Sequence, residues 1–95
     1  MSPKKKIELL KLRKKLDKID LELLNIIKKR SILVNKVLSL KEYKNQIIDK
    51  KRINQILKKI KTISKKKKID PKITNRIWKN MIWSYINYEK RNFKK

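Results

Sequence analysis

The 95-residue chain contains no cysteine, no histidine, no glycine and no alanine. Without cysteine there is neither a disulfide framework nor a thiolate nucleophile, and without cysteine or histidine we expect no zinc site. No apolar run approaches the ~18 residues that a membrane-spanning helix requires. The N-terminal segment MSPKKKIELLKLRKK lacks the apolar core of a secretory signal. These absences predict a soluble, cytoplasmic protein.

Lysine, isoleucine and asparagine are abundant and together make up 50 of the 95 residues. All three are encoded by AT-rich codons, so the composition indicates an AT-rich genome. The net charge of +23 would ordinarily suggest a nucleic-acid or anionic-surface partner. Here many lysines can simply be the solvated residue that such a genome supplies. A basic residue is therefore informative through its position in the pattern rather than its presence.

The apolar spacing predicts an all-α protein of one domain, residues 1–95, with three helices. The first begins at Ser2-Pro3, a hydroxyl cap followed by proline, and meets no proline or glycine up to about residue 44. The segment EYKNQII breaks the pattern and predicts a loop. A second helix follows Asp49, and a third follows Asp70-Pro71. The inward face expected for the third helix comprises Ile73, Ile77, Met81, Ser84, Tyr85 and Tyr88.

The length of the first helix predicts a dimer. About 40 residues at 1.5 Å each give ~60 Å, whereas a compact domain of this size is roughly 30 Å across. The apolar stripe continues along the whole helix, from Ile7 to Leu40. A second copy of the chain is the simplest cover for the overhanging part, so we expect an intertwined homodimer.

Two cations, Arg30 and Lys41, fall on the apolar stripe of this first helix. They are 11 residues apart, which places them on one face, ~16 Å apart along the axis. A buried cation costs several kcal/mol unless it is paired. No carboxylate lies three or four residues from Arg30. The partner could therefore be an anionic ligand.

Three further polar residues interrupt predicted apolar faces: Arg13 in the first helix, Arg52 in the second and Ser84 in the third. In a small helical bundle this pattern describes a positively charged cavity. Arg13 lies ~25 Å along the helix from Arg30, so it would serve the cavity of the partner chain. Plainer interpretations stay open: Arg13 could pair with Asp17 or Asp20, Lys41 could mark a helix end, and Asp49 could be only a cap.

Several segments, in order, resemble the all-helical, AroQ-type chorismate mutases. LLKLRKKLDKIDLELLNIIKKRSILVNKVLSLK is similar to the first helix of that family, DKKR to its Asp-x-x-Arg element, and ITNRIWKNMIWSYINYE to its last helix. The resemblance covers nearly the whole chain. It implies the chorismate mutase II fold, a homodimer, and the rearrangement of chorismate to prephenate in aromatic amino acid biosynthesis, without a metal or cofactor.

Carried over by position, the resemblance assigns the catalytic clamp to three cations. Arg13 of one chain and Arg30 of the other would hold the two substrate carboxylates. Lys41 would bond the ether oxygen and a carboxylate or hydroxyl. Arginine suits carboxylates because its planar fork matches them bidentately, and lysine supplies a point charge.

The resemblance also assigns four residues beyond the first helix. Arg52 and Ser84 would complete the carboxylate side, and Asp49 would lie near the ring hydroxyl. The family usually has Glu after the Asp-x-x-Arg element and Gln four residues after the Ser position, whereas this chain has Ile53 and Tyr88. A Tyr88 hydroxyl could donate to the ether oxygen, while Glu89, about 100° round the helix, is expected to be a poor substitute.

Alternatives to the mutase remain at this point. The related isochorismate pyruvate-lyases share the fold and cationic site, and WSYI is faintly similar to them. A basic helical protein could instead bind nucleic acid through phosphate contacts, although its six aromatic residues form no alternating basic-aromatic stripe. A degenerate, non-catalytic relative is a further possibility. The sequence identifies no partner enzyme.

Overall fold

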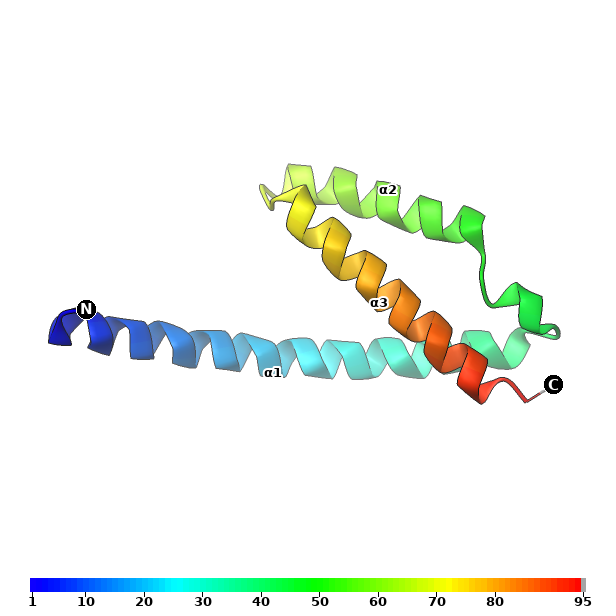
Figure 1. Ribbon diagram of the computed structural model, residues 1–95, viewed down its shortest axis with the longest axis horizontal. Helices are drawn as coiled ribbons and strands as arrows, with labels where there is room; N and C mark the ends of the chain where they lie inside the picture. Colours follow the sequence, from blue (N-terminus) through cyan, green and yellow to red (C-terminus); the bar gives the residue numbers. More distant parts are fainter. Residues whose placement is uncertain (95) are drawn as a thin grey trace. The chain divides into compact units, whose positions relative to one another are not determined.

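The computed structural model describes residues 1–94, and these are almost entirely helical (Figure 1). Helix α1 spans Pro3–Leu40, α2 spans Lys50–Lys66 and α3 spans Pro71–Asn92, with a short 3-10 turn, η1, at Lys44–Gln46. The described residues contain no strand. The predicted all-α fold of three helices is confirmed, although α1 ends at Leu40 rather than near residue 44. Among residues 1–94, no helix is long and apolar enough to cross a membrane.

The chain divides into two compact units, the first of which is residues 1–34. This unit is the continuous helical stretch that begins at the Ser2 cap, where the Ser2 hydroxyl accepts from the Lys5 backbone N–H at 3.3 Å. Most of its large apolar side chains are exposed: Ile7, Leu10, Leu12, Leu16, Ile19, Leu21, Leu23, Leu24, Ile26, Ile27, Ile32 and Leu33. A single helix has no core of its own, so this unit by itself leaves its apolar side chains uncovered.

The second unit begins at Asn35 and contains the last turns of α1, η1, α2 and α3. Both later helices are capped as the sequence predicts. The Asp49 carboxylate accepts from the Arg52 backbone N–H at 3.0 Å, and the Asp70 carboxylate accepts from the Lys72 backbone N–H at 2.9 Å. These bonds satisfy backbone donors that have no partner inside the helix.

Helices α2 and α3 pack against each other and are joined by a short turn (Figure 1). At this turn Lys68 has a φ of 58°, in the left-handed region. Next to the turn, Ser64 and Thr74 are both buried, and their hydroxyl oxygens lie 2.7 Å apart. Ser64 also donates to the Ile60 carbonyl at 2.6 Å. The hydroxyl pair thus ties the end of α2 to the start of α3 within a buried environment.

The hydrophobic core of the second unit is small and includes residues from α1 and α3 and from the loop. It consists of Leu38, Ile47, Ile82 and Ile86, with Ile48, Ile53, Ile56, Leu57 and Phe93 packed around it. Helix α2 therefore contributes Ile53, Ile56 and Leu57 to the packing around the core.

The inward face predicted for α3 is wrong in register. Ile73 and Ile77 are 56% and 51% exposed, and Ser84 is also exposed. The buried residues of α3 are instead Thr74, Ile82, Ile86 and Glu89. The helix carries large apolar or aromatic residues on nearly every side, so helical periodicity alone does not select one face.

Candidate functional site

The residues predicted to form the site are distributed over both units. Arg13 and Arg30 belong to residues 1–34, and the other five, Lys41, Asp49, Arg52, Ser84 and Tyr88, belong to the second unit. Arg13 is exposed, and Arg30 is half-buried. The predicted roles of both arginines in binding carboxylates remain predictions.

The ammonium of Lys41 forms an ion pair with the carboxylate of Glu89. Lys41 follows the last residue of α1, and its Nζ lies 3.3 Å from both Oε1 and Oε2 of Glu89 in α3. The exposed fractions of the two side chains are 19% for Lys41 and 8% for Glu89. Lys41 does lie at the end of α1, yet its side chain turns inward to Glu89 instead of extending into solvent.

The position of Glu89 follows from helical geometry. Ile82, Ile86 and Glu89 are spaced by four and three residues, so they lie on one face of α3. The two isoleucines belong to the core, and this directs the Glu89 carboxylate inward. A buried carboxylate costs several kcal/mol unless it is paired. The ion pair with Lys41 provides that compensation and holds the chain after α1 beside α3.

An open cleft lies beside this pair. It is lined by Lys41, Gln46, Ile48, Asp49 and Lys50 and has a volume of about 590 Å³, within the range of small-molecule sites. The Gln46 side chain fixes the loop by accepting from the backbone N–H groups of Glu42 and Tyr43 at 2.8 and 2.9 Å. The structure thus brings Lys41 and Asp49 together, with two ammonium groups at the cleft.

Arg52 and Ser84 do not lie on buried faces, contrary to expectation. Both are exposed in the single chain. The Ser84 hydroxyl donates to the Asn80 carbonyl of its own helix at 2.7 Å, and Arg52 contributes its backbone N–H to the Asp49 cap. The Asp49 carboxylate is therefore an N-cap, whatever else it binds. The predicted contacts of Arg52 and Ser84 with substrate remain predictions.

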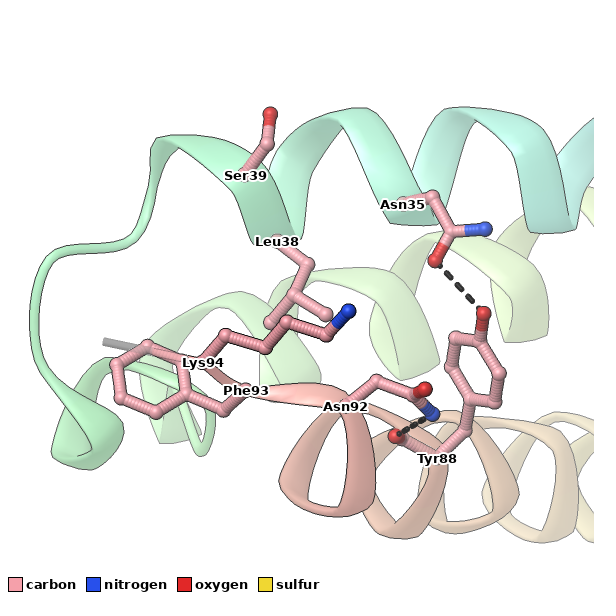
Figure 2. Close-up of a pocket in the computed structure, with 7 residues that line it drawn as sticks. All are labelled: Asn35, Leu38, Ser39, Tyr88, Asn92, Phe93 and Lys94. Atoms are coloured by element: carbon pink, nitrogen blue, oxygen red, sulfur yellow. Dashed lines mark hydrogen bonds between the residues drawn. The ribbon is translucent and has the colours of Figure 1, made fainter.

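Tyr88 faces a different part of the second unit. Its hydroxyl donates to Asn35 Oδ1 at 2.9 Å, and its ring lines a second cavity, together with Leu38, Asn92 and Phe93 (Figure 2). Lys41 does not line that cavity. Adjacent residues of α3 thus face different surroundings: Glu89 meets Lys41, and Tyr88 meets Asn35.

The pairing of Glu89 with Lys41 was not predicted from the sequence. Glu89 was expected to be a poor substitute for the Gln of the family because it lies about 100° from Tyr88, yet it is Glu89 that faces Lys41. One signal was present in the sequence. Glu89 is the only carboxylate side chain from Pro71 onwards, in a stretch that contains seven cations. A lone acid on the helical spacing of Ile82 and Ile86 indicates a pairing partner for a buried cation.

The second unit thus presents an open cleft lined by two lysines and one aspartate. The family model for chorismate mutase type II matches residues 12–90 of the 95-residue chain. The protein therefore belongs to the chorismate mutase type II family, as the resemblance implied. No curated protein and no solved structure matches the chain.

Proposed function

We propose that this protein is a chorismate mutase, which rearranges chorismate to prephenate. In this reaction one ether C–O bond breaks and one C–C bond forms within a single molecule, so no nucleophile, proton or co-reactant is consumed. The supporting observation is an inward-facing Lys41 beside an open cleft in a chain of the chorismate mutase type II family. The reaction is accelerated by a positive charge beside the ether oxygen of the substrate, and the Lys41 ammonium would supply that charge.

Two physical effects would accelerate this reaction. The substrate is a flexible dianion, and holding both carboxylates fixes the compact conformer in which the two reacting carbons are close. The ether oxygen gains negative charge as its bond breaks, and a preorganised ammonium stabilises that charge more strongly in the transition state than in the ground state. We assign the first role to Arg13 and Arg30, by the resemblance, and the second to Lys41.

We propose that the active protein is a homodimer in which each site receives Arg13 from the partner chain. The apolar side chains of residues 7–33 support this assembly, because twelve of them are exposed in the single chain. A monomeric soluble protein rarely leaves so large an apolar surface in water. A second copy related by a two-fold axis would cover the same surface on both chains.

The direct test is to incubate the purified protein with chorismate and identify the product by NMR. We expect prephenate to form well above the uncatalysed rate. A parallel reaction with isochorismate, monitored for pyruvate, distinguishes the related lyase chemistry. Prephenate formation at only the background rate would refute the proposed function, and pyruvate release would assign the lyase activity instead.

The dimer is tested independently by sedimentation velocity at micromolar chain concentration. We expect a species of twice the 11.6 kDa chain mass. Replacing Leu16 and Leu23, both exposed on α1, by Asp should shift the distribution towards monomer. A monomer in the unmodified protein would contradict the assembly.

A further inference from the structure

The ion pair between Lys41 and Glu89 raises a question that the proposed chemistry leaves open. We assign the Lys41 ammonium to the ether oxygen of the substrate, but in this structure it contacts both carboxylate oxygens of Glu89. Glu89 is one of the least exposed residues of the described chain, at 6%. A buried acid next to a site for a dianion opposes substrate binding through like-charge repulsion. Its presence there calls for a compensating role.

The geometry of the pair suggests that role. Lysine has four methylene groups and three donor hydrogens, and its side chain loses considerable conformational entropy when it is fixed. Both Nζ–O distances are 3.3 Å, longer than the ~2.7–2.9 Å of a tight charge-assisted hydrogen bond. The ammonium therefore lies symmetrically and loosely between the two oxygens. At most two of its three hydrogens point to Glu89, so one is left for a ligand.

The surroundings of Lys41 show why an anchor is needed. Lys41 follows the end of α1, and its backbone N–H donates to the Leu38 carbonyl at 3.1 Å, so the residue is attached to the helix only through its last turn. The cleft next to it is open to solvent, and a free lysine side chain in such a position would extend into water. Glu89, which lies on the same face of α3 as the core residues Ile82 and Ile86, contacts the ammonium with both carboxylate oxygens.

We propose that Glu89 is a positioning residue, which holds the Lys41 ammonium at the wall of the cleft so that its remaining hydrogen faces the anionic ligand. This inference rests on the proposed function for its catalytic consequence, because Lys41 is the group that would meet the ether oxygen. Glu89 itself acts through Lys41 and needs no contact with substrate.

The first measurement is the reactivity of Lys41, which does not depend on catalysis. The protein is treated with a limiting amount of an amine-acylating reagent, and the modification of each lysine is quantified by peptide mass spectrometry. The exposed Lys50 at the same cleft is the internal reference. In Glu89→Gln, which keeps the shape and removes the charge, we expect acylation of Lys41 relative to Lys50 to rise by about threefold or more, because the ammonium loses the carboxylate that shields it.

The second measurement is the steady-state kinetics of the same variants. Glu89→Gln should lower kcat about tenfold or more with less than about a threefold change in KM, since an ill-positioned ammonium is felt mainly in the transition state. Glu89→Asp retains the charge but withdraws it by one methylene, and should show a partial effect on both readouts. Glu42→Gln removes the same charge from an exposed position of the same unit and should change neither.

The outcomes separate this inference from the proposed function. If Lys41 labelling is the same in wild type and Glu89→Gln, the ammonium is not held by Glu89 and the inference is wrong. If labelling rises but kcat is unchanged or increases in an active enzyme, the pair has no positioning role and the inference is also wrong. A wild-type protein that shows no turnover would refute the mutase assignment, while Glu89-dependent labelling of Lys41 would still support the positioning of the ammonium.

Discussion

The buried hydroxyl pair between α2 and α3 offers a quantitative test of the structure through Ser64→Ala. Ser64 is 3% exposed, and its hydroxyl both donates to the Ile60 carbonyl and meets the Thr74 hydroxyl at 2.7 Å. A hydroxyl carries one hydrogen. If that of Ser64 goes to Ile60, Thr74 must donate to Ser64. The substitution then removes an acceptor from a buried donor, whose nearest alternative is the Pro71 carbonyl at 3.4 Å.

The expected cost can be worked out from these contacts. Two buried hydrogen bonds contribute about 1 kcal/mol each, and the higher helix propensity of alanine offsets about 0.5 kcal/mol. Ser64→Ala should therefore destabilise the protein by about 1.5 kcal/mol. Thr74→Val leaves the Ser64 hydroxyl bonded to Ile60, so we expect about 1 kcal/mol. The double variant should cost less than the sum of the two by about 1 kcal/mol, because neither hydroxyl is then left unpaired.

Urea unfolding followed by circular dichroism, at one fixed chain concentration, measures all three variants. With a typical slope of 1–3 kcal/mol/M, Ser64→Ala should lower the midpoint by roughly 1 M. Ser84→Ala is the matched control, because Ser84 makes the same bond to a carbonyl four residues earlier but is exposed. That control should stay within about 0.5 kcal/mol of wild type. Equal effects at Ser64 and Ser84, or additive effects of Ser64→Ala and Thr74→Val, would refute the buried pair.

Three further predictions concern local features. Lys68→Gly should stabilise the protein by up to about 1 kcal/mol in urea unfolding, because Lys68 is in the left-handed region. Lys67→Gly should destabilise it, because Lys67 has a φ of −86°, and the reverse order of the two variants would contradict the turn geometry. Asp49→Ala should cost about 1 kcal/mol through loss of the α2 cap and Asp49→Asn much less, so equal losses would point to a role for charge instead. Tyr88→Phe, which removes the bond to Asn35, should leave chorismate turnover within about threefold of wild type, and a loss beyond about tenfold would support the catalytic role that the resemblance implies for the Tyr88 hydroxyl.

The sequence was sufficient to predict the elements that depend on local chemistry. Asp49 and Asp70 each precede a helical segment, and a carboxylate at that position satisfies free backbone N–H groups whatever the tertiary structure. The three helices were accordingly predicted with boundaries close to those observed. Lys41 was placed on an apolar stripe that ends at Leu40, and its side chain does turn inward, but the buried residue beside it is Leu38, whereas Val37 and Leu40 of that stripe are exposed.

The orientation of α3 could not be predicted in the same way. The buried Ile82 and Ile86 have several large apolar or aromatic neighbours in the sequence, so more than one face of this helix is apolar. These neighbours are Trp78, Met81, Trp83, Tyr85 and Tyr88. Packing against α2 and the last turn of α1 selects among them. A shift of one residue rotates a helical face by about 100°, so Glu89 rather than Tyr88 lies on the face of Ile82 and Ile86. The four-residue spacing that was matched to Ser84 and Tyr88 also fits Tyr85 and Glu89, one residue further along the helix.

If the catalytic site needs residues from two chains, two variants that are each inactive should restore activity when they are mixed. Arg13→Ala and Lys41→Ala should each abolish chorismate turnover. When equal amounts are unfolded and refolded together, half of the dimers should be mixed, and each mixed dimer has one site with both residues intact. Activity should therefore return to about one quarter of the wild-type value. No recovery from the mixture, in a protein whose wild type is active and dimeric, would contradict the shared site.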